Sequence, residues 1–420
     1  MPQVGARLGA LHERQFRLLW LARTSSFAGD SLIGVALVFA VLSVSRSPVA
    51  VGSVLAVFTV SRVALTLVGG VYADRLPRRT VMLACDGTRA LVEVFTAAML
   101  LTGHMTLALF FVTAGLFGAA SAFFGPAATG LVPQTVSAGR LHAANALLAM
   151  SQSATNVFGP LLSGLLVAGV GAGWVFAIDA ATFVASMLFL LRLSVPAHVR
   201  GTAQPFLLDL AGGVEAVRTR TWVWLSMVAF AVTNLCFAAF LVLGPVVARD
   251  ELSGARQWGV IAMGGAIGAL AGAAIALRVR PRRPLTAAFA GWVLCSLPLL
   301  ALAPPLPAAA DAAAYGIGLG GVFFGTALWQ TTLQTRIPQN VLARVSSIDW
   351  LVSLLFMPIG FVAFGPLAEA VGTGATLVVA GGAIAVVNAL VALSPPVRGV
   401  RMLTRGGGEV AATPVSSAGA

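Results

Sequence analysis

Several charged side chains stand inside long apolar stretches of this 420-residue sequence, where proton-transfer chemistry would suit them. Asp30 lies near the middle of the first stretch, and Arg62 lies at a comparable depth in the second. Asp86, Arg89 and Glu93 follow in the third stretch at positions i, i+3 and i+7, which places them on one face of a helix. Ionisable groups are costly in hydrocarbon, so each of these residues is a functional candidate.

A buried carboxyl group holds its proton more tightly when it loses water, and less tightly when an arginine approaches. A protein that changes water access or moves an arginine can therefore load and release a proton. The sequence favours Asp30 and Glu93 as proton-coupling residues, with Arg62 and Arg89 as their partners. Asp86 is a further candidate. The alternative is a static ion pair that locks the first three helices together.

The elements that hold these residues are predicted by composition. The chain is 58% hydrophobic and 10% charged, with a mean hydropathy of +0.94. A soluble domain carries about 25% charged residues. The apolar runs reach about 20 residues, enough to cross a bilayer as a helix. They lack the alternation of membrane strands, and lipid satisfies no backbone hydrogen bonds. These observations predict an all-α protein embedded in the lipid bilayer.

We expect twelve transmembrane helices in two pseudo-symmetric six-helix bundles. The predicted ranges are 16–44, 49–72, 80–101, 105–130, 141–169, 173–193, 221–247, 257–278, 284–303, 308–335, 346–369 and 373–394. The expected organisation is an N-terminal bundle (1–193), a central cytoplasmic loop (194–220), a C-terminal bundle (221–395) and a disordered cytoplasmic tail (396–420). The first apolar run is too long for a signal peptide and is interpreted as the first membrane helix.

The basic residues indicate an orientation. All 26 are arginine, and the net charge is +12. Twenty of them fall on the side of the predicted helices that holds both termini, three on the other side and three within spans. The excess of arginine in cytoplasmic loops of membrane proteins predicts that both termini are cytoplasmic, in a bacterial inner membrane. This distribution accounts for the positive charge without a nucleic-acid partner.

Three short motifs recur in the same order about 205 residues later. Residues 70–79, 132–134 and 159–161 correspond to residues 277–283, 337–339 and 365–367. Duplicated six-helix halves are typical of secondary transporters, which bind substrate between the halves and rock them around it.

The loop between the second and third helices carries the first family resemblance. Residues 70–79 resemble the signature of the major facilitator superfamily, G-x-x-x-D-R-x-x-R-R, and match it at Gly70, Asp74, Arg75, Arg78 and Arg79. The resemblance implies a cytoplasmic gate in which the acid faces an arginine or a helix N-terminus. Asp349, expected at the start of the eleventh helix, is assigned to the same gate. The alternative for the arginines is simple anchoring at the membrane surface.

The fifth helix carries a second resemblance. Gly159, Pro160, Ser163 and Gly164 resemble the end of the antiporter motif of superfamily exporters, with Ser163 in place of a glycine. Small residues let helices approach closely and proline bends a helix, so plain packing is the alternative.

A third resemblance covers most of the chain. The segments that carry it are 16–23, 29–30, 86–90 and 178–180. They are similar to a branch that contains macrolide-efflux and enterobactin-exporter-like proteins, which implies proton-driven export of an amphipathic small molecule. The fourth helix lacks the Arg-x-x-Gln-Gly pattern of many drug–proton antiporters, so the role of that arginine is not carried over.

The substrate cavity is less well marked. Polar and aromatic candidates in the C-terminal half are Asn234, Trp329, Gln330 and Asn388. Asp179 is placed near the outer end of the sixth helix, where structural pairing is expected. The three cysteines are scattered through apolar spans and are expected to be free thiols.

The sequence contains no metal-ligand spacing, nucleophile elbow or phosphate loop. We therefore expect no enzyme activity, no metal and no cofactor, and a chain that works as a monomer. Two alternatives stay open: an exporter or importer of one dedicated metabolite such as a siderophore, and a non-transporting membrane sensor.

Overall fold

The computed structural model describes residues 9–73, 77–194, 217–304, 306–337 and 339–401. The N-terminal set of long helices is α2 (Arg14–Ser45), α3 (Pro48–Ala73), α4 (Arg78–Leu101), α5 (Leu107–Leu131), α6 (Leu141–Val170) and α7 (Ala172–Leu191). The C-terminal set is α9 (Thr221–Glu251), α10 (Ala255–Arg278), α11 (Pro284–Val293), η4 (Leu294–Ser296), α12 (Leu297–Leu302), α13 (Ala308–Arg336), α14 (Gln339–Val371) and α15 (Thr373–Leu393). Short helices at ends and connections are η1 (Gly9–His12), η2 (Val132–Gln134), η3 (Ala138–Arg140) and α16 (Pro395–Arg398). These ranges contain no strand, and the predicted all-α fold is confirmed.

The predicted helices match the observed ones in order and position, with two differences. The ninth is interrupted, because α11 passes through the 3₁₀ turn η4 into α12, where Pro298 at the helix start cannot donate a backbone hydrogen bond. The eleventh, α14, begins at Gln339 rather than at residue 346. Asp349 therefore lies ten residues inside the helix and not at its start.

Ten of the described helices are long and apolar enough to cross a membrane. The charged residues Asp86, Arg89 and Glu93 in the middle of α4 make that helix an exception. The apolar part of α14 is a shorter segment, Leu355–Val371. Charge and length thus separate these two helices from the other ten.

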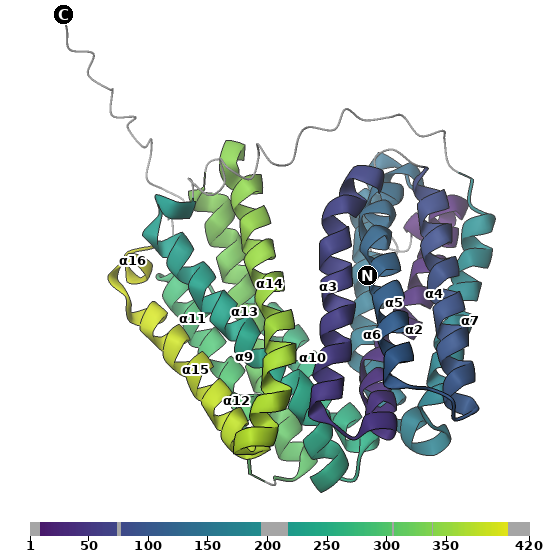
Figure 1. Ribbon diagram of the computed structural model, residues 1–420. Helices are drawn as coiled ribbons and strands as arrows, with labels where there is room; N and C mark the ends of the chain where they lie inside the picture. Colours follow the sequence, from purple (N-terminus) through teal and green to yellow (C-terminus); the bar gives the residue numbers. More distant parts are fainter. Residues whose placement is uncertain (1–8, 74–76, 195–216, 305, 338, 402–420) are drawn as a thin grey trace, which may run out of the picture.

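The helices pack as two groups that lie side by side (Figure 1). In the first group α2 packs against α6 and α7, α4 packs against α5 and α7, and α3 packs against α5. In the second group α9 packs against α14 and α15, and α13 packs against α10 and α11.

The two groups meet through α6 with α10 and through α3 with α14. A methyl group at Gly164 of α6 would overlap the carbonyl oxygen of Ala255, and one at Gly52 of α3 would overlap that of Phe361. The Ser47 hydroxyl also donates to the Glu369 carboxylate over 3.0 Å. These contacts involve the starts of α3 and α10 and the later parts of α6 and α14. The groups converge at that end and diverge at the opposite one (Figure 1).

The three cysteines Cys85, Cys236 and Cys295 are buried and free, as the sequence predicted. Cys236 and Cys295 belong to the same hydrophobic cluster, on α9 and η4, whereas Cys85 on α4 belongs to another. The native chain therefore offers few accessible thiols.

A polar clamp ties the start of α2 to the connection before α6. The Glu13 carboxylate accepts hydrogen bonds from the Ser137 amide at 2.9 Å and hydroxyl at 2.7 Å, and from Arg140 at 3.3 Å. The Ser137 hydroxyl contributes most to lowering the pKa of Glu13 below its ordinary value of 4.5, although partial burial acts in the opposite direction. The ionised form of Glu13 is thus favoured in the folded protein.

Replacing Glu13 with glutamine is expected to lower stability at neutral pH by no more than about 1 kcal/mol, because ion pairs at a protein surface are weakened by water. Since the native pKa lies below the unfolded value, this contribution is present above pH 4.5 and disappears as the pH falls through the native pKa. Thermal unfolding in detergent, measured for both proteins from neutral pH downward, checks this. A stability difference that is the same at every pH would contradict it.

Candidate functional site

The centre of the site is Arg89, which points from α4 into the N-terminal group of helices. Its side chain is 2% exposed. The guanidinium lies 4.3 Å from the ring centroid of Phe124 and 4.4 Å from that of Phe183. Aromatic faces attract a cation and shield it from lipid and water. The two rings thus provide an apolar, cation-attracting environment for the guanidinium group.

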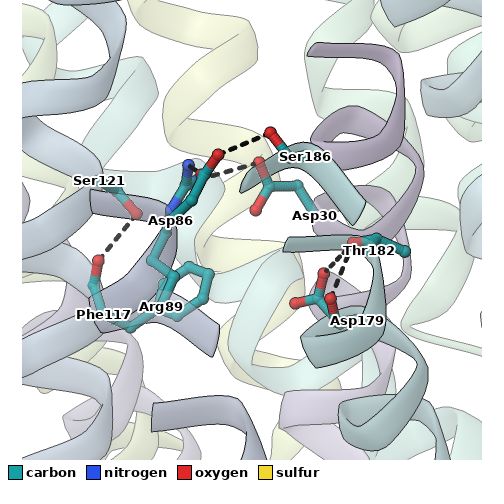
Figure 2. Close-up of polar contacts among 8 residues, drawn as sticks. All are labelled: Asp30, Asp86, Arg89, Phe117, Ser121, Asp179, Thr182 and Ser186. Atoms are coloured by element: carbon teal, nitrogen blue, oxygen red, sulfur yellow. Dashed lines mark hydrogen bonds and ion pairs between the residues drawn. The ribbon is translucent and has the colours of Figure 1, made fainter. Parts of the chain in front are cut away.

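The strongest partner of Arg89 is Asp86, one turn earlier on the same helix. The two residues form an ion pair and hydrogen bond through Nη2 and Oδ1. The other oxygen of Asp86 accepts a 2.6 Å hydrogen bond from the Ser186 hydroxyl on α7 (Figure 2). Both oxygens of this fully buried carboxylate are therefore satisfied. The pair matches the static arrangement that the sequence left open as an alternative.

Asp30 approaches the same arginine from α2. Its Oδ2 lies 3.5 Å from Nη1 of Arg89, a longer contact than an optimal charged hydrogen bond (Figure 2). The Asp30 side chain is 39% exposed, because it faces a cavity inside the helix group. The charge of Arg62 on α3 also acts on Asp30. Three of the predicted coupling residues are thus brought together with Asp86.

The cavity has a volume of about 450 Å³ and is lined by residues of the N-terminal helices. Its ionisable lining residues are Arg23, Asp30, Arg62, Arg89 and Glu93. Its aromatic lining residues are Phe27, Phe58, Phe117, Phe124 and Phe176. An apolar wall with a few charged groups is typical of sites for small molecules.

Glu93 lies one turn beyond Arg89 on α4 and is 3% exposed. Its Oε2 atom is buried and has no hydrogen-bond partner among the described residues. The charges of Asp179, Asp30 and Arg89 all act on it. Glu93 is therefore a buried acid without a dedicated counterion in this part of the chain.

Asp179 on α7 belongs to the same cluster, although the sequence assigned it to structural pairing near a helix end. It is fully buried, and the Thr182 hydroxyl lies 3.2 Å from its Oδ1 (Figure 2). A methyl group added at Gly29 would overlap that oxygen, so the carboxyl group rests on the α2 backbone next to Asp30. A lone acid inside an apolar run was the available signal, but its partners come from other helices.

Arg23 on α2 also lines the cavity, with its guanidinium carbon 5.0 Å from the ring centroid of Phe27. Its Nε is buried without a hydrogen-bond partner among the described residues. The cavity thus carries a positive group near its edge in addition to Arg62 and Arg89.

Comparison with known proteins shows the family to which the chain belongs. A sequence profile of the Major Facilitator Superfamily matches residues 19–353. The chain belongs to the major facilitator superfamily. It is therefore a membrane transporter with the twelve-helix architecture of that family, as the sequence predicted.

Relatives of this superfamily member include the enterobactin exporter EntS of Salmonella choleraesuis, which is 28% identical over 90% of this chain and 91% of its own length. The multidrug efflux pump Tap of Mycobacterium tuberculosis is 28% identical over 47% of this chain and 49% of its own length. The nucleoside transporter NupG has a similar structure, with a TM-score of 0.72, 13% identity and coverage of 89% of this chain and 98% of its own. A bacterial homologue of the iron transporter ferroportin, in an inward-facing state, gives a TM-score of 0.70 at 18% identity, covering 91% and 99%.

The superfamily signature loop is described only in part. Asp74 and Arg75 lie outside the described residues, and Gly70 is described only as part of the α3 backbone. Arg78 donates to the carbonyl oxygen of Gly130 at the end of α5. Arg79 donates at 2.7 Å to the carbonyl oxygens of Leu190 and Leu191 at the end of α7. The two arginines thus bind helix C-termini, where a positive charge is favourable.

The antiporter-like motif lies at two helix contacts of the superfamily fold. A methyl group at Gly159 would overlap Ser31 of α2, and the Ser163 hydroxyl donates over 2.6 Å to the carbonyl oxygen of Leu32. Gly164 instead faces Ala255 and Gly259 of α10. Pro160 stands inside α6 between these contacts. The motif therefore joins α6 both to the helix that carries Asp30 and to the other bundle.

The substrate candidates of the C-terminal half are not part of the wall of the cavity formed by the N-terminal helices. Trp329 is 2% exposed, and its indole N–H donates over 3.0 Å to Asp349. Asn388 is buried and donates to the Thr233 hydroxyl and the Ile384 carbonyl, both at 2.9 Å. Asn234 donates to the carbonyl oxygen of Phe230, and Gln330 is partly exposed. Their role in substrate binding stays a prediction.

A second cavity of about 930 Å³ lies between α10, α11 and α13 and is lined only by apolar residues. Glycines of α10 and α13 form much of its wall. They also let the two helices approach closely, because methyl groups at Gly268 and Gly272 would overlap the carbonyl oxygens of Gly316 and Gly320. Of these two cavities, the one formed by the N-terminal helices is the one with charged groups in its wall. Among the described residues, no group of three or more metal-ligating side chains is arranged to hold a metal ion.

Proposed function

We propose that this superfamily member exports amphipathic small molecules in exchange for protons. The observation that carries the proposal is the cavity of the N-terminal helices, whose wall contains Asp30, Glu93 and Arg89, with Asp30 in contact with the arginine. Export is supported by the names of two relatives, an enterobactin exporter and a multidrug efflux pump. The N-terminal helices line this cavity without a residue from a second copy of the chain, which supports a functional monomer.

The distribution of arginines supports cytoplasmic termini in a bacterial inner membrane. In that orientation the contacts of Gly52 and Gly164 close the outer end of the transporter. The end at which the bundles diverge then faces the cytoplasm, where an exported compound enters.

The unequal partners of Arg89 support a proton step at Asp30. Asp86 holds the guanidinium closely, whereas Asp30 contacts it at 3.5 Å and reaches the cavity. Protonation of Asp30 breaks this weaker ion pair, while Asp86 continues to neutralise the charge of Arg89. Asp30 is therefore the acid of the cluster that can exchange its partner between arginine and proton.

The wall of the cavity supports the proposed substrate class. Five phenylalanine rings provide apolar contact area, and Arg23 and Arg62 supply positive charge at defined places. Such a surface suits a compound with an apolar body and a polar or anionic part.

Replacing Asp30 with asparagine is expected to abolish gradient-driven accumulation of a fluorescent amphipathic dye in inside-out vesicles, because an amide cannot carry the proton. The measurement compares dye uptake with and without a proton gradient. Asp250→Asn is the matched control, since Asp250 is half-exposed and paired with its neighbour Arg249. Gradient-driven uptake that survives in the Asp30 variant would contradict the assignment of coupling to Asp30.

A second candidate function is export of one dedicated metabolite such as a siderophore. It is favoured by the relative EntS, whose similarity extends over 91% of that protein. A panel of dyes, macrolides and siderophores distinguishes the two, because a dedicated exporter moves one class and a multidrug exporter moves several. A non-transporting sensor predicts no gradient-driven movement of any compound.

A further inference from the structure

The proposed exchange at Asp30 leaves two buried acids without an assigned role as a pair, Glu93 and Asp179. They project from α4 and α7, which pack against each other. Each has one buried carboxyl oxygen with no hydrogen-bond partner among the described residues. Unpartnered ionised carboxylates are strongly disfavoured in such surroundings.

Arg89 is not placed to neutralise them. Its guanidinium carbon lies over the rings of Phe124 and Phe183, and its Nη atoms contact Asp86 and Asp30. In the described part of the chain no hydrogen bond joins Arg89 to Glu93 or Asp179, and its Nε is unpartnered. Arg89 thus pairs closely with Asp86 and more loosely with Asp30. Glu93 and Asp179 lie beyond its hydrogen-bonding reach.

The surroundings of Asp179 contain more acids than cations. The facing groups are Asp30 from α2 and Asp86, Arg89 and Glu93 from α4. Helix α6, which also packs against α7, contains no Asp, Glu, Lys or Arg. Two neighbouring carboxylates that share too little positive charge cannot both stay ionised. At least one proton therefore belongs to this group.

The hydrogen bonding of Thr182 indicates where that proton resides. The hydroxyl has one hydrogen, and its oxygen lies 2.8 Å from the carbonyl oxygen of Asp179 and 3.2 Å from Oδ1 of the same residue. If the hydroxyl donates to the carbonyl, the contact with Oδ1 is favourable when Asp179 is protonated and itself donates. The closer distance to the carbonyl supports this assignment.

We propose that Asp179 is a second proton-binding residue, which holds the transported proton together with Glu93 after it enters through Asp30. This inference rests on the proposed proton exchange. The acid group of Asp30 gives its proton to the carboxylate pair, and Asp30 then regains its ion pair with Arg89. Charge is conserved within the cluster, since one carboxylate is formed as another is protonated. The seat of Asp179 on Gly29, next to Asp30, provides the short path.

The test is infrared difference spectroscopy of the full chain in liposomes during a stepwise rise in pH. A protonated carboxylic acid has a carbonyl stretching band that disappears on ionisation. Wild-type protein should show such a band at neutral pH, and Asp179→Asn should lose it. Thr182→Val removes the hydroxyl but keeps the acid, so the band should remain and shift in frequency. Asp250→Asn is the control and should leave the band unchanged.

The proposal is overturned if the band of Asp179→Asn equals that of wild type, or if only Asp30→Asn removes it. Thr182→Val keeps the test decisive if the asparagine variant does not fold, because an unshifted band would also contradict the assignment. Dye transport by the same liposomes is scored separately. Wild-type protein that shows the band but moves no compound would contradict the proposed function and leave the proton site in place.

Discussion

Replacing Arg89 with methionine is expected to destabilise the protein by about 3 to 5 kcal/mol and to abolish transport. Removing one member of a buried ion pair leaves an uncompensated charge, which is the source of this large effect. Here the residue left behind is Asp86, which is fully buried and would retain only the hydroxyl of Ser186. The loss also removes the cation between Phe124 and Phe183.

The three buried cysteines provide the measurement. A thiol-reactive fluorophore reports unfolding in detergent as Cys85, Cys236 and Cys295 become accessible. Arg140→Met is the matched control: Arg140 is half-exposed and pairs with Glu13 at 3.3 Å, so its loss should cost about 1 kcal/mol or less. The double variant Asp86→Asn/Arg89→Met should recover much of the stability but not transport. A single Arg89 variant as stable as the control would refute the account of the buried pair.

The second large effect is expected at the contact between the two bundles. In Gly52→Val the new side chain would overlap the carbonyl oxygen of Phe361, and backbone atoms cannot move aside cheaply. Overpacking of this kind costs about 1 to 3 kcal/mol. Separating α3 from α14 relieves the overlap, so the variant should favour the state in which this end is open. Transport should stop, because the cycle requires the end to close.

A cysteine introduced at Ser47 reports this change, since Ser47 bonds to Glu369 across the same end. Labelling by a membrane-impermeant maleimide should become several-fold faster in the Gly52 variant. The buried native cysteines give little background. Gly169→Val is the control, because nothing lies within 4 Å of a methyl group at that position of α6. Equal labelling rates for the two variants would show that Gly52 does not control the contact.

The fold could be predicted because each membrane helix corresponds to an apolar run of residues that is long enough to cross the bilayer. The clustering of Asp86, Arg89 and Glu93 followed from helical spacing alone, and the structure brings Asp30 to the same arginine. The positive charges of Arg78 and Arg79 were evident from the sequence. Their hydrogen-bond acceptors were not, because these are backbone oxygens at the ends of α5 and α7.

Asp179 shows why the rest of the site was missed. Its burial depends on Gly29, a residue 150 positions away that stood out in the sequence only as part of a segment of family resemblance. Trp329 is a second example. Its indole N–H donates to Asp349, and its ring packs against Phe230 and Trp222. The residue type alone could not show that this tryptophan is buried among such partners. Periodicity reveals which residues share a helix face, but not which helix lies opposite.

The placement of Asp30, Asp86, Arg89, Glu93 and Asp179 within one bundle has a consequence for the response to membrane voltage. These charges keep their positions relative to one another when the two bundles rock, because none of their contacts crosses the contact between bundles. Rocking of the bundles therefore does not separate any of these ion pairs along the membrane's electric field. The transporter should sense voltage through the depth at which a proton enters and leaves the cluster, and so through the length of its water-filled access on each side.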